Sequence, residues 1–297
     1  MDLTILSFLA APFAASLVIA GIHAYLGVHV VERGVIFVDL SLAQIAALGG
    51  TIAVLLPMTN HDPHHPGVYW ISLGFTFIGA AVFSTIRSRR ARIPQEAIIG
   101  ISYAVASAAA ILAMSKATSQ AEHLTNMLVG TILAVSWPDV IKTALLYGVI
   151  GLFHYFFRRQ FLLISMDPRA AETQGLSIRF WDFLFYASFG FVVTRSVAIA
   201  GVLLVFCYLI VPSVAAMLYS DRIGPRLAIG WAMGTVVSAL GVYHSLLLDL
   251  PTGATIVCTF GLVLILMALV RPLIQRSAPT DTHQVDYGDR PHMPATR

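Results

Sequence analysis

Charged residues are scarce in this sequence. Only 11% of its 297 residues are Asp, Glu, Lys or Arg, whereas 58% are hydrophobic and the mean hydropathy is +0.81. A soluble globular domain carries about 25% charged residues, because its surface must face water. The composition therefore excludes a soluble protein and predicts an all-α, polytopic membrane domain whose surface faces lipid.

Lysine is nearly absent, which excludes an ATP site of the P-loop type. The two lysines, Lys116 and Lys142, follow Ser115 and Ile141, whereas a P-loop lysine follows a glycine-rich turn and reaches the β- and γ-phosphates. If ATP drives this protein, a separate subunit must hydrolyse it. We expect a subunit that is not an enzyme, with no cofactor and no nucleic-acid partner.

Cysteine, glycine and proline are too few to indicate other classes of protein. The two cysteines, Cys207 and Cys258, lie in apolar runs, so a disulfide framework has no support. The 22 glycines and 14 prolines do not suffice for a collagen-like or disordered chain. We expect one transmembrane domain over residues 1–276 and a disordered cytoplasmic tail over residues 277–297.

The apolar residues form runs long enough to cross a bilayer. A hydrocarbon core of about 30 Å needs roughly 20 apolar residues per helix, which divides the chain into about nine candidate spans. The division is weakest between Arg195 and Ala200. The candidates run from Leu3 to Leu26, Gly34 to Leu56, Val68 to Ile86, Glu96 to Ser115, Pro138 to Phe157, Trp181 to Val197, Ile199 to Tyr219, Leu227 to Leu247 and Thr252 to Val270.

Arginine gathers in alternate loops between these spans. Lys and Arg collect on the cytoplasmic side of a membrane, and an odd number of spans puts nearly all of them there. Lys116, Lys142 and Arg195 are left near the other side. This predicts an outer N-terminus and a cytoplasmic C-terminus. The basic loop residues are Arg33, Arg87, Arg89, Arg90, Arg92, Arg158, Arg159, Arg169, Arg179, Arg222, Arg226, Arg271 and Arg276.

One apolar segment is too short to span the membrane. Leu124 to Val135 holds about twelve residues, which at 1.5 Å each cover about half of the core. We expect a half-membrane or re-entrant helix that is buried in protein or lines a wet cavity.

The longest cytoplasmic link contains a short helix of its own. Asp167 suits the N-cap, Pro168 the first helical position, and Gly175 the position just past the end. Arg169 and Glu172 are among its polar residues. The helix either ties two spans together or docks on a cytosolic partner as a coupling helix.

Three polar residues within the predicted spans are candidates for a functional site, because a charge at that depth costs at least a few kcal/mol. Asp39 either pairs with Arg33 or lines a transport pathway. Gln44 either forms an interhelical hydrogen bond or contacts a substrate. Glu96 either stabilises the start of its own helix, after Pro94, or belongs to the pathway.

Metal-ligating side chains concentrate on the predicted outer side. Imidazole and carboxylate suit zinc, manganese or ferrous iron, but the spacing matches no closed structural zinc site. These residues form either an entry funnel for a cation or ordinary wet loops. His23 and His154 lie in apolar runs instead and are expected to be packing residues. The candidate entry residues are His61, His64, His65, His123 and Asp249.

Several stretches together match the sequence pattern of one family. They are Gly201 to Val205 (G-V-L-L-V), Leu209 to Ala216 (L-I-x-P-A-A-x-A), Leu248 to Val257 (D-x-P-x-G-A-x-I-V), Ala97 to Ile101 (A-I-G-I), Leu128 to Leu133 (L-x-G-x-I-L) and Asp167 to Gly175 (D-x-x-x-A-x-x-x-G). Through them the chain resembles the zinc/manganese/iron permeases of bacterial ATP-binding-cassette importers, over about Pro12 to Val270.

The resemblance implies a permease homodimer in the lipid of a bacterial cytoplasmic membrane. It also implies two cytosolic ATPase subunits, which meet the helix from Asp167 to Gly175, and one extracytoplasmic metal-binding protein. The permease would import a divalent metal between its protomers, past Asp39, Gln44 and Glu96.

The second span departs from the family pattern D-x-L-S-H-A. Leu42 stands where the family has His, and Asp39 lies one position later in the sequence than the Asp of the pattern. A permease for a non-metal cargo, an ion-gradient-driven secondary transporter and an exporter are the alternatives. An intramembrane metalloenzyme would need a pair such as His-x-x-x-His on one span, which the sequence lacks.

Overall fold

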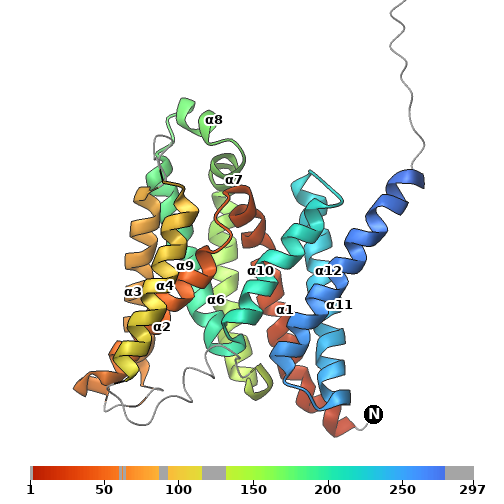
Figure 1. The fold of residues 1–297 in the computed structure, drawn as a ribbon, viewed down its shortest axis with the longest axis horizontal. Helices are drawn as coiled ribbons and strands as arrows, with labels where there is room; N and C mark the ends of the chain where they lie inside the picture. The colour runs from red at the N-terminus through yellow and green to blue at the C-terminus, as the bar shows by residue number, and fades with distance from the viewer. Residues whose placement is uncertain (1–2, 60–61, 63–64, 87–92, 116–131, 278–297) are drawn as a thin grey trace, which may run out of the picture.

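The computed structural model describes residues 3–59, 62, 65–86, 93–115 and 132–277. These residues form helices and 3-10 turns, with no strand among them, so the all-α prediction is confirmed (Figure 1). The elements are α1 (Leu3–Glu32), α2 (Val38–Leu55), η1 (Pro57–Thr59), α3 (Pro66–Ile86), α4 (Gln95–Met114), η2 (Ile132–Ala134), α6 (Trp137–Phe156), α7 (Arg158–Met166), α8 (Pro168–Thr173), α9 (Ile178–Ala200), α10 (Val202–Met217), α11 (Ile223–Leu248) and α12 (Thr252–Ser277).

Seven of the described helices are long and apolar enough to cross a membrane, namely α1, α2, α3, α4, α9, α11 and α12. The pair α6 and α7 bends by 75° between its members and counts as an eighth span if the two are taken together. The helix α10 is apolar but has only 16 residues. The chain is therefore a multi-span membrane protein.

The weakest predicted boundary falls at a glycine. The helix α9 ends at Ala200 and α10 begins at Val202, and Gly201 between them has φ +77°. Glycine adopts this backbone conformation without a steric cost, whereas other residues rarely do. The two spans therefore divide a few residues later than the sequence indicates.

Two predicted segments lie largely outside the described residues. Residues 124–131 of the predicted half-membrane helix are among these, and the described remainder forms the single 3-10 turn η2. Residues 278–297 of the predicted tail also lie outside, while Ser277 is still part of α12.

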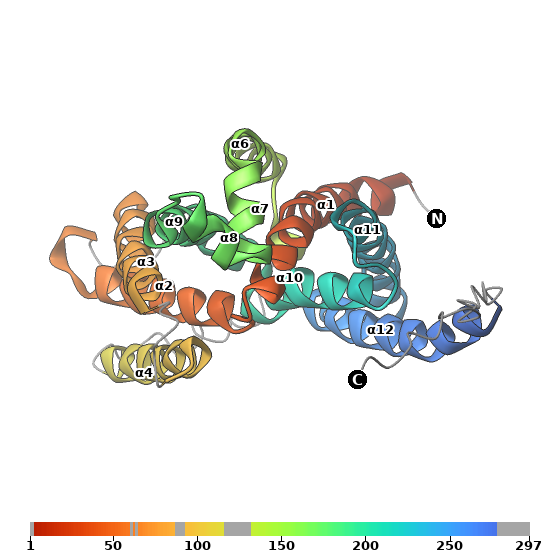
Figure 2. The ribbon, with the colours of Figure 1, turned by 90° about the horizontal axis from the view of Figure 1, so that it is seen from above.

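The helices form two packed groups. In one, α2 packs against α3, α4 and α9; in the other, α1 packs against α10 and α11, and α11 against α12 (Figure 2). The helix α6 contacts both groups through α1 and α9. The helices α4 and α12 lie on one side of the molecule, and α6 lies on the opposite side (Figure 2).

Small residues allow the helices to approach closely, as is common where membrane helices pack. At Gly27 of α1, an added Cβ would collide with the backbone oxygen of Leu209 and the hydroxyl of Ser213 in α10. At Gly241 of α11, it would lie 2.6 Å from Ile256 of α12. The crossings of α1 with α10 and of α11 with α12 therefore depend on glycine.

We expect Gly27→Ala to destabilise the protein by about 1–3 kcal/mol, because the new methyl group meets rigid backbone. Gly74→Ala is the matched control, since a Cβ at Gly74 would meet nothing within 4 Å. The control should be neutral or gain up to about 1 kcal/mol from helix propensity. Thermal unfolding of the purified proteins in detergent measures both, and equal midpoints would contradict the packing role of Gly27.

Candidate permeation site at the start of α2

The turn between α1 and α2 brings a carboxylate of α4 onto the start of α2. Gly34, with φ +67°, lets the chain reverse after α1. The backbone N–H of Phe37, the residue before α2, donates to Oε1 of Glu96 at 2.9 Å. A carboxylate is favoured at a helix N-terminus by the helix dipole. Glu96 therefore stabilises the start of α2, and it also lies in the first turn of its own helix, α4, where the sequence suggested such a role.

Asp39 lies in the first turn of α2, with 1% of its surface exposed. Its carboxylate interacts with the backbone N–H groups of residues 39 and 40 and lies within electrostatic range of Glu96. Oδ1 of Asp39, Oγ of Ser41 and Oε2 of Glu96 are buried and have no hydrogen-bond partner among the described residues. Buried acceptors rarely stay unsatisfied, and two neighbouring carboxylates favour a cation between them.

Gln44 occupies another face of α2 than Asp39, whereas Leu42 lies about 60° around the helix from Asp39. Gln44 is buried but lies five residues after Asp39, which is about 140° around the helix. Leu42 is fully buried, and its Cδ2 lies 3.1 Å from where a Cβ at Gly79 of α3 would stand. The position that carries His in the family pattern therefore faces the core.

The helix α10 contributes a neighbour that the sequence analysis missed. The half-buried thiol of Cys207 lies within electrostatic range of Asp39, and Phe206 stacks on Phe37 with ring centroids 6.4 Å apart. Sulfur is a soft metal ligand. The signal available in the sequence is a cysteine inside an apolar span.

The predicted entry funnel is not assembled within the described residues. His61, His64 and His123 lie outside them, and no group of three or more His, Cys, Asp or Glu that could hold a metal occurs in the part that the structure describes. Nδ1 of His65 accepts the N–H of Gly67 at the start of α3. Asp249 is exposed in the turn after α11, with φ +50°.

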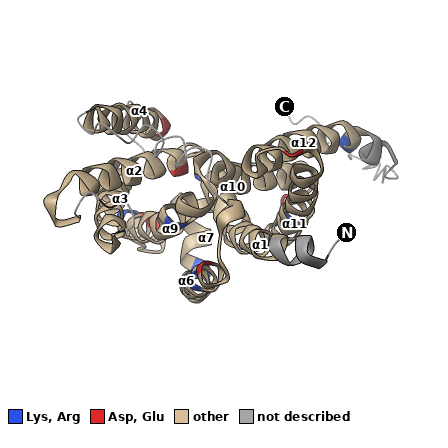
Figure 3. Ribbon diagram, turned by 90° about the horizontal axis from the view of Figure 1, so that it is seen from below, with Lys and Arg blue, Asp and Glu red and all other residues tan. Residues whose placement is uncertain are grey.

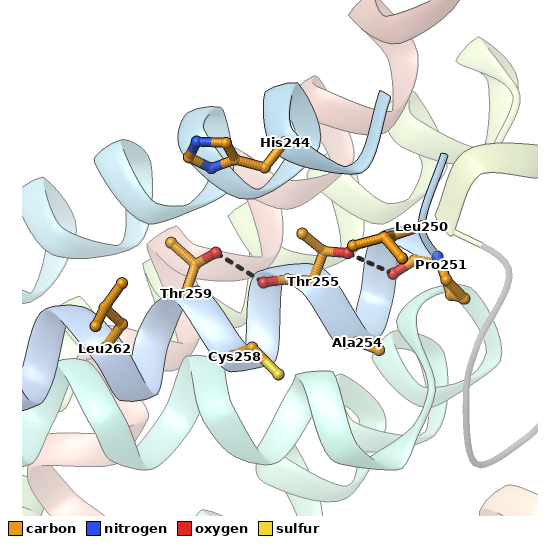
Figure 4. Close-up of a pocket in the computed structure, with 8 residues that line it drawn as sticks. All are labelled: His244, Leu250, Pro251, Ala254, Thr255, Cys258, Thr259 and Leu262. Carbon is orange, nitrogen blue, oxygen red and sulfur yellow. Dashed lines mark hydrogen bonds between the residues drawn. The ribbon is translucent and has the colours of Figure 1, made fainter. Parts of the chain in front are cut away.

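A cavity of about 300 Å³ lies beside that turn, between α11 and α12. Figure 4 shows His244 on one wall and Cys258 on the other, with their side chains pointing apart. The hydroxyls of Thr255 and Thr259 donate to backbone oxygens one turn earlier in α12, at 2.9 and 2.7 Å. The walls therefore present no converging ligands for a metal.

A buried polar network connects α1, α7 and α9 behind the site. Arg33 at the end of α1 pairs with Asp182 of α9 at 2.5 Å, and both side chains are fully buried. Its Nε donates to the hydroxyl of Ser165 in α7, and its guanidinium lies over the ring of Phe185. The hydroxyl of Ser165 also contacts His29 at 2.8 Å. Arg33 thus pairs with Asp182, a partner that the sequence analysis did not identify.

The histidines in apolar runs, His23 and His154, are buried as expected of packing residues, but Nε2 of His23 has no hydrogen-bond partner among the described residues. Nδ1 of His23 lies 2.9 Å from the backbone oxygen of Ile19. The ring of His154 lies between the hydroxyls of Tyr25 and Ser188, at 3.3 and 2.8 Å.

The helix α8 forms as its sequence indicates and projects at one end of the molecule (Figure 1). The carboxylate of Asp167 accepts the N–H groups of Arg169 and Ala170 at 3.1 and 3.0 Å. Gly175 has φ +76° and its N–H donates to the oxygen of Glu172. Arg169 and Glu172 are exposed on this helix. The connection between α10 and α11 and the end of α12 lie at the same end of the molecule (Figure 1).

Comparison with known proteins matches residues 6–271 to the model of the ABC 3 transport family. The chain belongs to this family. The manganese transport system membrane protein MntC of Listeria monocytogenes is 24% identical over 90% of this chain and 91% of its own. A probable iron transport system membrane protein of Haemophilus influenzae is 26% identical over 86% of this chain and 88% of its own.

A solved structure shows the same fold. A chain in PsaBC from Streptococcus pneumoniae, solved in complex with a Fab, superposes with a TM-score of 0.72 and 22% identity, over 88% of this chain and 90% of that one. The shared fold therefore covers most of this chain.

Charged residues are few along the spans of this ABC 3 protein (Figure 3). Removing the carboxylate of a buried ion pair can be compared with removing the carboxylate of an exposed one. We expect Asp182→Ala to cost about 3–5 kcal/mol, because removing one partner of a buried ion pair leaves the other uncompensated. Asp139→Ala is the control, since the Asp139–Arg195 side chains are 42% and 24% exposed and such pairs contribute at most about 1 kcal/mol. Thermal unfolding in detergent compares the two, and equal losses would refute the structural role of the buried pair.

Proposed function

We propose that the chain is the membrane permease of an ATP-binding-cassette importer for divalent metal ions, with zinc, manganese and iron as candidates. An extracytoplasmic binding protein delivers the metal, and a cytosolic ATPase drives transport. Membership of the ABC 3 family carries this proposal, together with relatives named for manganese and iron transport. The permease itself performs no covalent chemistry.

The metal passes the start of α2 in this proposal. The buried oxygens of Asp39, Ser41 and Glu96 support it, since they have no hydrogen-bond partner in the part of the chain that the structure describes and a passing divalent cation would satisfy them. Carboxylate and carbonyl oxygens are suitable ligands for manganese, and carboxylates also bind iron and zinc. Gln44, further along α2, His61, His64, His65 and His123 in the outer loops, and Asp249 complete the proposed path.

Energy from ATP enters through α8 in this proposal. Its exposed Arg169 and Glu172 would meet the ATPase subunit, and Asp167 and Gly175 hold the helix in shape. The elements on either side of α8, namely α7 and α9, are joined to the end of α1 by Arg33. A shift of α8 would therefore be transmitted to the turn that begins α2.

We further propose nine membrane crossings, an outer N-terminus, a cytoplasmic C-terminus and a homodimer. The nine include α10, whose 16 residues extend about 24 Å, and α6 with α7 as one crossing. The N-terminal end of α1 and the C-terminal end of α12 lie at opposite ends of the molecule, which supports an odd number (Figure 1). The host membrane is the bacterial cytoplasmic membrane.

A permease of the same class for a non-metal cargo is the second candidate. The apolar, fully buried side chain of Leu42 favours it, because the family pattern has a metal-ligating His there. An uptake experiment separates the two candidates. Cells would express the permease with its neighbouring ATPase and binding-protein genes, be offered zinc, manganese and iron, and be compared with an ATPase-dead control.

ATP-dependent uptake of one metal would support the metal importer and identify its cargo. An assembled complex that hydrolyses ATP but takes up none of the three metals would refute the metal proposal and support the second candidate. Metal uptake that persists in the ATPase-dead control would instead indicate a secondary transporter.

We expect Asp39→Asn to raise the metal concentration for half-maximal uptake at least about tenfold, because even outer partners of metal ligands contribute 10–100-fold to affinity. Asp221→Asn is the matched control, because the side chain of Asp221 is fully exposed. Its ion pair with Arg226 is long, with 3.7 Å between Oδ1 and Nη2. Radiometal uptake at equal membrane abundance measures both. Normal uptake by Asp39→Asn would show that Asp39 is not part of the proposed transport path.

We expect Arg169→Glu to reduce co-purification of the ATPase with the permease several-fold, because the substitution reverses a charge on the proposed docking helix. Arg271→Glu, an exposed reversal in the last part of α12, is the control and should retain the ATPase. Equal retention by both variants would exclude Arg169 from the ATPase interface.

A further inference from the structure

A groove of about 560 Å³ lies between α1, α6 and α11. On α1 its lining residues recur at helical spacing from Val18 to Tyr25, so one face of that helix forms one wall. On α6 the lining extends from Ala144 to Tyr155, a length of about 16 Å, which is about half of a bilayer core. The groove therefore extends along about one leaflet of the membrane.

Glycines keep this groove open. Gly21 of α1 and Gly151 of α6 both line it, and a Cβ added at either position would meet no atom within 4 Å. These glycines differ from Gly27, where the neighbouring backbone leaves no room for a methyl group. Their effect is to leave empty volume at membrane depth.

The walls of the groove present hydrocarbon surfaces, because their polar tips are already engaged. Nε1 of Trp231 donates to the oxygen of Gly21 at 2.9 Å. The hydroxyl of Tyr147 donates to the oxygen of Val192 at 3.1 Å. The hydroxyl of Tyr25 contacts His154. Such a groove suits an alkyl chain and leaves a polar solute without partners.

One charged side chain lines the groove, at the end near α7. Arg158 begins α7, is exposed, and its guanidinium lies 4.5 Å from the centroid of the Tyr155 ring. Among the described residues it forms no pair with a carboxylate, and its Nη1 donates to the backbone oxygen of Tyr155 at 3.2 Å. The exposed Arg222, next to the lining residue Ile223, adds a second positive charge near this end.

We propose that this groove binds an anionic phospholipid, with an acyl chain along Gly21, Gly151 and Trp231 and the phosphate at Arg158. Basic residues beside a groove between membrane helices are complementary to anionic lipid headgroups. The flanking helices α6 and α11 lie away from α4, which carries Glu96 of the candidate permeation site (Figure 2). The inference does not depend on which cargo is transported.

Quenching of Trp231 fluorescence by brominated lipid tests the proposal. The permease would be reconstituted into phosphatidylcholine vesicles that contain a minor fraction of either dibrominated phosphatidylglycerol or dibrominated phosphatidylcholine. The Trp231 signal is the emission that Trp231→Phe removes. We expect phosphatidylglycerol to be preferred about fivefold, since a basic residue contributes about 1 kcal/mol to binding an anionic surface.

Three variants complete the design. Arg158→Gln should abolish the preference for phosphatidylglycerol, and Gly151→Leu should fill the groove and reduce quenching by it. Gly100→Leu, on α4, is the matched control, because a Cβ there also meets nothing within 4 Å. The control should leave quenching unchanged.

Equal quenching by the two lipids, in the parent protein, would overturn the proposal. So would an undiminished preference in Arg158→Gln, or unchanged quenching in Gly151→Leu. Efficient disulfide cross-linking of two copies through Gly151→Cys, with no quenching of Trp231, would show that a second copy occupies the groove instead.

Discussion

The buried ion pair between Arg33 and Asp182 is the constraint on which the arrangement of the site depends. A single arginine among apolar helices would carry a large desolvation cost, so its carboxylate partner fixes the end of α1 against α9. The hydroxyl of Ser165 accepts a hydrogen bond from Arg33 and so holds α7 against the same end of α1. Because the chain turns into α2 directly after Arg33, this pair also determines where Asp39 lies.

This connection gives the proposed transport mechanism a physical route. The helix α8 follows α7 and precedes α9, and both of these elements bond to Arg33. Asp39 comes six positions after Arg33, and the intervening turn is held by the Glu96 carboxylate from α4. A displacement of α8 would therefore be transmitted to Asp39 and Glu96 of the candidate permeation site through hydrogen-bonded groups rather than through deformable apolar contacts. Such a route requires two discrete arrangements of the network, one for each access state.

The sequence was sufficient for features that depend on local chemistry or on average hydropathy. Membrane spans follow from apolar length, and α8 follows from Asp167, Pro168 and Gly175, which act on adjacent backbone groups. The partners of Arg33 and Glu96 could not be predicted, because Asp182 is 149 residues away and α4 packs beside α2 through tertiary contacts. For the same reason the sequence did not identify Cys207 as a candidate ligand, because its role depends on its proximity to Asp39 and not on its neighbours in sequence.

The displacement of the acidic residue by one position along α2 has a consequence for metal choice. One residue corresponds to about 100° of helix rotation, so Val38 and Leu42 face the core while Asp39 faces α4 and α10. The proposed path thereby exchanges an imidazole for a second carboxylate, Glu96, with a thiol nearby. Oxygen ligands alone favour a harder cation such as manganese, whereas a contribution from Cys207 favours zinc. The metal preference of this permease would then depend on whether α10 brings its sulfur to the cation during transport.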